Sequence, residues 1–200
     1  TKIDYGYTAK ATDDDTGVNY LRITDIAQSS LDWSNVPFCE IPVKIGDKYN
    51  LYENDIVIAR TGASVGTAKQ IRNLDQKSVF ASYLVRIRPS EGVDPHYLGV
   101  ILESDIYQNW VLGISSGSAQ PNANAQMLVD FDVPLPPINT QRRIGVIARN
   151  IDDLIENNRR RIEILEESAK ALYREWFVHY RYPGHENDTI VDSELGPIPS

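Results

Sequence analysis

The sequence predicts an α+β protein in which a β-rich α/β domain is followed by one long C-terminal helix. Three observations carry this prediction. Short segments that alternate or contain many β-branched residues, bounded by Gly and Pro, recur over residues 1–137. Residues 138–180 instead show sustained helical spacing, and residues 181–200 are polar and contain Pro and Gly. We therefore expect a globular domain, a long helix and a linker towards a second half.

The first domain contains three segments that resemble strands. Residues 20–24 alternate between apolar and polar side chains, as a half-buried strand does. Residues 55–60 are rich in β-branched side chains and lead into the glycine-containing turn 61–66. Residues 79–88 alternate again and are followed by Pro89. These segments predict the scaffold of a sheet.

A helix is expected next, at residues 95–111. Asp94 is suited to cap its N-terminus, and Pro95 fits the first helical position. Residues 115–126 are small, polar and turn-forming, which predicts a loop, and residues 131–137 form an extended piece that prolines terminate.

The long helix is indicated by residues 140–178, which contain no Pro and a single Gly. At 1.5 Å per residue, such a helix is about 57 Å long. Its apolar stripe cannot be buried against itself, so we expect a partner helix of similar length. The residues predicted to pair are Ile147, Ile151, Leu154, Asn158, Ile162, Leu165, Leu172 and Trp176.

Two polar features of this helix have alternative interpretations. Asn158 lies on the stripe, where the spacing has a stutter; it either fixes the register of helix pairing or lies at the edge of the seam. Residues 159–161 are three consecutive arginines, which form either a patch for the DNA backbone or a solvated helix face.

Composition limits the functional classes. With 42% apolar residues the chain can bury a core, and the single Cys39 excludes a disulfide framework and a multi-Cys zinc site. A reducing, cytoplasmic setting fits, and no apolar run reaches membrane-spanning length. The net charge of −8 is unfavourable for nucleic-acid binding, so DNA binding would require a local basic face or phosphate contacts from other subunits.

No motif predicts a catalytic site, a metal site or a cofactor. The sequence has no G-x-G, and the turn at residues 62–69 lacks the Lys-Ser/Thr of a P-loop. Asp55, Asp75 and Lys77 could imitate the paired carboxylates and lysine of a metal-dependent nuclease. However, residues 73–77 are typical of a turn, not of the strand that presents such groups.

Several segments together resemble a known family. They are YLRITDI (20–26), IARTGASVG (58–66), GSAQPN (117–122), PLPP (134–137), QRRI (141–144) and ALYREWF (171–177). In order and spacing they are similar to the specificity subunit of type I restriction-modification systems, over essentially the whole chain. Thr140 is a small departure, because an acidic residue is more usual before the Gln.

The resemblance implies a non-catalytic subunit that recognises double-stranded DNA. Such subunits contain two target-recognition domains, each followed by a long helix, and the two helices pack antiparallel and set the distance between two DNA half-sites. Methyltransferase subunits supply S-adenosylmethionine and the methylation chemistry, and restriction subunits join for cleavage. The present chain would correspond to one half, which could form a homodimer through its helix.

Base-reading residues are expected outside the family signatures, because members of one family read different sequences. The less typical segments are residues 10–18, 29–48 and 69–78. Predicted base or backbone contacts are Lys10, Lys69, Gln70, Arg72, Asn73 and Lys77, and predicted phosphate contacts are Arg60, Thr61 and Ser64. For each, a solvated surface role is the alternative, and Trp33 is either a core residue or a wedge against bases.

Three functional hypotheses follow. The first is a DNA-recognition subunit without enzymatic activity. The second is a coiled-coil scaffold that assembles partners without binding DNA, and the third is a metal-dependent nuclease. Salt-dependent binding to one defined duplex separates the first two, and Mg²⁺-dependent cleavage by the isolated chain would indicate the third.

Overall fold

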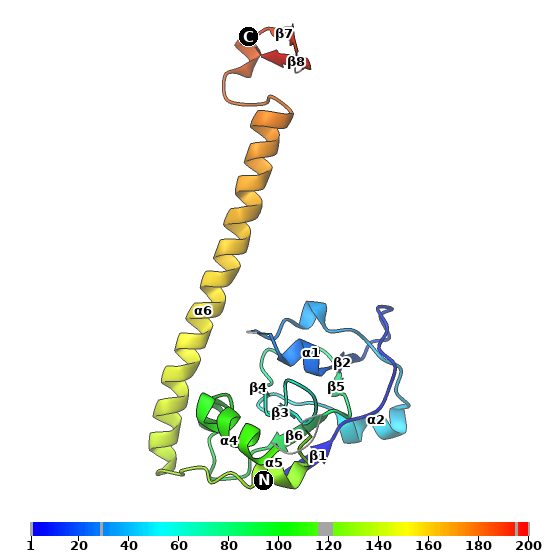
Figure 1. The fold of residues 1–200 in the computed structure, drawn as a ribbon, viewed down its shortest axis with the longest axis vertical. Coiled ribbons are helices and arrows are strands. Elements are labelled where there is room, and N and C mark those ends of the chain that lie inside the picture. Colours follow the sequence, from blue (N-terminus) through cyan, green and yellow to red (C-terminus); the bar gives the residue numbers. More distant parts are fainter. Residues whose placement is uncertain (1, 29, 116–121, 195, 200) are drawn as a thin grey trace. The chain divides into compact units, whose positions relative to one another are not determined.

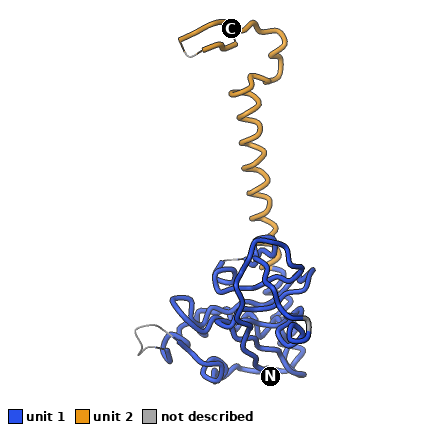
Figure 2. Tube along the Cα trace, turned by 90° about the vertical axis from the view of Figure 1, so that its right-hand side faces the viewer, with its two compact units in different colours: residues 1–150 blue, residues 151–200 orange. Residues whose placement is uncertain are grey.

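The computed structural model describes residues 2–28, 30–115, 122–194 and 196–199. The chain divides into two compact units, residues 1–150 and 151–200 (Figure 2). Most of the GSAQPN signature, residues 117–121, lies outside the described residues, as does Ser29 of one predicted DNA-reading segment.

The first unit is built on a four-stranded antiparallel sheet with the order β1-β6-β3-β4. Its strands, labelled in Figure 1, are β1 (Lys2–Tyr5), β3 (Ile56–Ala59), β4 (Ala68–Gln70) and β6 (Leu84–Arg88). Strand β3 confirms the prediction for residues 55–60. It is buried along its whole length because both sides of the sheet are covered.

Side chains of β3 alternate between two separate cores. Ile56 and Ile58 pack with Val85 and Ile87 under the helices α3 (Pro95–Leu102), α4 (Asp105–Ser115) and α5 (Ala125–Val129). Val57 and Ala59 pack with Leu21, Ile26 and Phe80. The period of two residues along the strand therefore fixes its register in both cores.

The second core lies beside a two-stranded parallel sheet of β2 (Asn19–Leu21) and β5 (Ser78–Phe80). Short helices accompany it: α1 (Ile23–Ile26), the 3₁₀ helix η1 (Trp33–Asn35) and α2 (Val43–Tyr49). The expected single strand at residues 79–88 is thus two strands in different sheets. A turn separates them, in which the N–H of Leu84 donates to the carbonyl of Ala81 and that of Ser82 donates to Tyr7.

The predicted helix at residues 95–111 begins as expected but is broken. The Asp94 side chain accepts a hydrogen bond from the Tyr97 N–H, which confirms the N-cap. Helix α3 ends at Leu102, and the carboxylate of the next residue, Glu103, accepts a hydrogen bond from the Gln70 N–H at the edge of the sheet. A new helix, α4, starts at Asp105.

The long helix is confirmed. Helix α6 (Ile138–Tyr173) is continuous over 36 residues and leads into a π-helical turn, η2 (Arg174–Val178). None of the helices among the described residues has both the length and the apolar character to cross a membrane.

Residues 181–200 differ from the expected linker. They contain the 3₁₀ helix η3 (His185–Asn187) and a hairpin of β7 (Ile190–Ser193) and β8 (Gly196–Pro199). Gly196, the first residue of β8, has a φ of +96°, a region that only glycine adopts easily. Proline and acidic residues are unusual in strands, so the sequence did not predict that Ile190 and Val191 pair with β8.

Candidate functional site

The glycine turn that follows β3 is held by backbone hydrogen bonds at both ends. The N–H of Gly66 donates to the Ala59 carbonyl, and the N–H of Ala59 donates to Thr67. Gly62 and Gly66 have φ values of +77° and +86°, a region that favours glycine. The turn carries three predicted phosphate contacts, Arg60, Thr61 and Ser64, and all three are half-buried.

Helix α4 fixes the far end of this turn. Gln108 Nε2 donates to the Gly66 carbonyl at 2.5 Å. A Cβ on Gly66 would lie 2.9 Å from two carbon atoms of Val111, so the backbone of the turn fits closely against the helix. The predicted contact loop is therefore rigidly placed, and Gln108 is a positioning residue that the sequence analysis did not identify.

Arg60 is held at the start of the turn. Its guanidinium carbon lies 5.0 Å from the centre of the Tyr5 ring, within the range of a cation–π contact. Its backbone N–H donates to Tyr83, and its carbonyl accepts from Ala123. The Arg60 Nε is buried and has no hydrogen-bond partner among the described residues.

Two of the predicted DNA-reading residues lie in a strand instead of a loop. Lys69 and Gln70 belong to β4, and the Lys69 ammonium forms an ion pair with Glu103 at 3.2 Å. Gln70 is buried: its Nε2 donates to Asn54 Oδ1, and its Oε1 lies 3.1 Å from His96 Nδ1. These contacts favour a structural role for Gln70.

Residues 71–77 of this segment form a loop that tertiary contacts hold in place. The Arg72 carbonyl accepts a hydrogen bond from Trp33 Nε1, so the Trp33 ring helps to hold the loop and packs against the second core. The Glu53 carboxylate accepts from the backbone N–H groups of Asn73 and Leu74. Asn73 has a positive φ of 55° at this point.

The predicted contact residues differ in how far their side chains are exposed to solvent. Lys10, Asn73 and Lys77 are exposed, and Arg72 is half-buried. The Lys77 ammonium lies 3.6 Å from an exposed Asp47 carboxylate, an ion pair that solvent weakens. Of the six residues predicted to contact bases or backbone, Lys10, Asn73 and Lys77 are therefore exposed to solvent, whereas Gln70 is buried.

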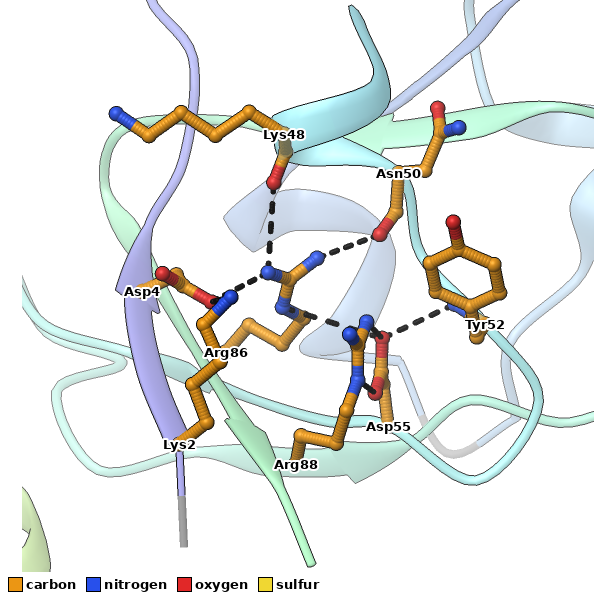
Figure 3. A network of polar contacts seen from close by, with 8 residues as sticks. All are labelled: Lys2, Asp4, Lys48, Asn50, Tyr52, Asp55, Arg86 and Arg88. Carbon is orange, nitrogen blue, oxygen red and sulfur yellow. Dashed lines mark hydrogen bonds and ion pairs between the residues drawn. The ribbon is translucent and has the colours of Figure 1, made fainter.

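Asp55, one member of the hypothetical nuclease site, belongs to a buried network (Figure 3). Both Asp55 carboxylate oxygens accept from Arg88, at 2.8 and 2.9 Å, and Oδ2 also accepts from the Tyr52 N–H. The hydrogen bond with Asp55 raises the pKa of Arg88, although burial acts in the opposite direction. The carboxylate is therefore occupied by protein donors, which speaks against the nuclease hypothesis.

Arg86 is the centre of the same network. It is only 2% exposed, and its guanidinium donates to Asp4 Oδ2 and to the carbonyls of Asn50 and Lys48. Asp4 has its pKa lowered, because hydrogen bonding and charge from Arg86 and Lys2 outweigh burial, which alone would raise it. The network connects β1 and β6 with the end of α2 and with Asp55, the residue before β3, and it is structural. Among the described residues, no group of three or more His, Cys, Asp and Glu side chains could hold a metal ion.

Within the second unit, the predicted pairing stripe is exposed. The exposed fractions of Ile151, Leu154 and Leu165 are 53%, 59% and 68%. Ile162 and Leu172 are exposed on the same side, as helical spacing requires, and Asn158 is exposed as well. Trp176 is half-buried in the π-helical turn. A row of large apolar side chains on one helix face is the arrangement of an unpaired coiled-coil seam.

Comparison with known proteins identifies the family. Residues 6–167 match the family described as the type I restriction modification DNA specificity domain. The chain belongs to this family. The match includes most of the first unit and most of α6, and the mixed fold with a long C-terminal helix agrees with the predicted fold class.

Relatives of the specificity-domain family share modest identity with this chain. The MjaIX specificity subunit of Methanocaldococcus jannaschii is 30% identical over 109 residues, which are 54% of this chain and 25% of that protein. The putative MjaX specificity subunit of the same organism is 26% identical over 200 residues, covering 97% and 46%. The chain therefore spans less than half the length of these relatives.

A solved structure supports the fold. The S subunit of a type I restriction-modification system from M. genitalium superimposes with a TM-score of 0.66 and 16% sequence identity, covering 88% of this chain and 43% of that one.

Proposed function

We propose that this chain is a non-catalytic specificity module that recognises one half-site of a bipartite DNA target. The observation that carries the proposal is the family match over residues 6–167, which spans the recognition domain and most of the long helix. The family match favours this function over the scaffold and nuclease hypotheses.

DNA recognition is assigned to the domain at residues 1–137, through two kinds of contact. Arg60, Thr61 and Ser64 present a rigid turn to the phosphate backbone, where a glycine turn allows backbone N–H groups to approach. Lys10, Arg72, Asn73 and Lys77 supply side chains for base edges or nearby phosphates. With a net charge of −8, the chain leaves most phosphate neutralisation to partner subunits.

Assembly is assigned to the helix at residues 138–180. Its exposed seam pairs with a second long helix, from another copy of this chain or from a second half, and methyltransferase and restriction subunits join the resulting complex. Residues 181–200 form the connecting region and its hairpin.

The proposal is tested by incubating the full chain and its methyltransferase subunits with a pool of randomised duplexes, and sequencing the retained DNA. We expect one short motif to be enriched, and binding of that duplex to weaken steeply as salt is raised, since phosphate contacts release counterions. Retention of DNA without any enriched motif would contradict sequence recognition. No retained DNA would favour the scaffold, and Mg²⁺-dependent cleavage by the isolated chain would favour the nuclease.

The assignment of individual residues is tested with Lys77→Ala. Loss of a base contact should weaken binding by about 1–3 kcal/mol and relax the motif at one position. A uniform loss across sequences would instead assign Lys77 to the phosphate backbone, and unchanged binding would remove it from the interface. Asp75→Ala, an exposed neighbour that is not a predicted contact, is the matched control.

A further inference from the structure

The side chain of Gln141, in the first turn of α6, forms hydrogen bonds that hold the start of this helix against the N-terminus of α3. Its side chain is 2% exposed, and its Oε1 accepts a hydrogen bond from the Asp94 N–H at 2.9 Å. Its Nε2 donates to the carbonyls of Pro136 and Gly92, at 2.8 and 3.3 Å. One amide therefore joins the helix to the segment that precedes it and to the loop that leads into α3.

Gly145 lies one helical turn further along the same face of α6. A Cβ on this residue would lie 2.7 Å from Asp94 Oδ1, 2.9 Å from His96 Cβ and 3.1 Å from the Tyr97 backbone nitrogen. Glycine is unfavourable inside a helix by about 1 kcal/mol, and Gly145 is the only glycine in the 36 residues of α6. The close approach to α3 gives a physical reason for its presence.

The contacted end of α3 is itself anchored to the sheet. His96 Nδ1 lies 3.1 Å from Gln70 Oε1, and Gln70 Nε2 donates to Asn54. The Tyr97 hydroxyl donates to the Pro134 carbonyl at 2.7 Å. A series of partly buried polar contacts therefore runs from β4 through α3 to α6, and all of it belongs to the first unit.

We propose that this contact is a rigid joint, in which Gln141 and Gly145 are positioning residues that immobilise residues 138–150 against the recognition domain. The physical reason is that the buried Gln141 amide bonds to three backbone groups, and the missing Cβ of Gly145 lets α6 pack closely against the start of α3. A consequence, which rests on the proposed function, is that the joint restricts the separation of half-sites that the assembled complex accepts.

The joint is tested by measuring a distance distribution within the first unit. Spin labels are attached to Lys44→Cys in α2 and Asn150→Cys in α6, both exposed positions, and the labelled chain is diluted with unlabelled chain. Cys39 can stay in place, since it is buried and its burial raises the pKa of its thiol to about 11, which leaves little reactive thiolate. Electron–electron double resonance then reports how the label separation is distributed.

The parent chain is expected to give a narrow distribution. Gly145→Ala and Gln141→Met should shift and broaden it, because the first inserts a methyl group into the contact and the second leaves three backbone groups without a partner. The matched control is Gly113→Ala in α4, where a Cβ meets nothing within 4 Å and the distribution should stay narrow. A broad distribution in the parent, or an unchanged narrow one in both joint variants, would overturn the joint.

Duplexes with lengthened and shortened spacers between half-sites test the consequence in the complex with methyltransferase subunits. If the joint restricts the separation of half-sites, the parent should prefer one spacer length. Gly145→Ala should reduce this preference, and Gly113→Ala should not. An equal preference in both variants would contradict the consequence. Failure of the parent to bind any duplex would refute the proposed function and leave the spin-label result for the joint intact.

Discussion

The recognition domain buries some of its charged side chains, whereas the second half of α6 exposes its large apolar side chains to solvent. In the domain, Arg86 is 2% exposed and is surrounded by two carboxylates and two carbonyls. In the helix, Leu165 is 68% exposed, and every residue of α6 after Gly145 is exposed or half-buried. The buried charge of the domain therefore has its partners within the domain, whereas the apolar face of the helix is available to pair with another helix.

This difference separates the requirements for folding from those for assembly. Residues 1–150 contain the two main cores, the four-stranded sheet and the joint at Gly145, so their stability depends on internal contacts. An isolated amphipathic helix gains little stability until its apolar face is covered. Substitutions in the domain should therefore change its unfolding, whereas substitutions in the helix seam should change association.

The largest effect is expected for Arg86→Met. Removing this guanidinium deprives the Asp4 carboxylate and the Asn50 carbonyl of the hydrogen bonds that Arg86 donates (Figure 3). The free energy of unfolding, measured by urea titration, should fall by about 3–5 kcal/mol. Arg160→Met, at an exposed site on the helix, is the control and should change it by no more than about 0.5 kcal/mol. Similar losses in both variants would contradict the distinction between the two regions.

Leu165→Ala should weaken helix pairing without destabilising the domain. If Leu165 becomes buried in a seam, its truncation should cost about 2–4 kcal/mol in association, measured by sedimentation equilibrium. Ile164→Ala is a matched control, because Ile164 is 53% exposed and lies on another face of the same turn. Equal effects of the two substitutions would place the pairing surface elsewhere.

Gly66→Ala tests how firmly the contact turn is held. The new Cβ would meet Val111 at 2.9 Å and would also occupy a positive φ, so a stability loss of about 2 kcal/mol is expected in urea titration. Gly62→Ala shares the positive φ but has nothing within 4 Å, and it should cost about 1 kcal/mol. A larger loss at Gly62 would indicate that α4 does not hold the turn.

The smallest effect concerns pH. Asp4 has a folded-state pKa below its ordinary value of 3.8, so its carboxylate stabilises the fold above that pH. The contribution is lost as the pH falls from 3.8 through the folded-state pKa. Urea titrations between pH 7 and pH 2 should therefore show a steeper loss of stability at the acidic end for the parent than for Asp4→Asn. If stability fell in parallel with pH in the parent and in Asp4→Asn, Asp4 would not contribute to the loss of stability at acidic pH.

The sequence predicted the features that local patterns determine. Strand β3, the N-cap at Asp94 and the long helix follow from β-branched residues, a capping side chain and helical spacing. The family also followed from the order of short motifs, including the QRRI segment that supplies Gln141 to the joint.

Features set by distant residues could not be predicted in the same way. At the end of α3 the Glu103 carboxylate accepts from the backbone of Gln70, and in the loop the Glu53 carboxylate accepts from the backbone of Asn73. Neither contact is evident from local patterns. Gln70 was selected as a DNA contact for its residue type, but its amide bonds to Asn54 and His96. The hairpin at residues 190–199 was missed because β8 contains two prolines, which usually argue against a strand.

The most direct test of the whole account is the affinity ratio for two duplexes of equal length and composition, one carrying the selected motif and one with that motif scrambled. In the complex with methyltransferase subunits, we expect the selected duplex to bind about 10³-fold more tightly or better. Lys77→Ala should reduce this ratio, whereas Ile164→Ala should leave it unchanged. Equal affinity of the parent complex for both duplexes would contradict sequence recognition by this chain.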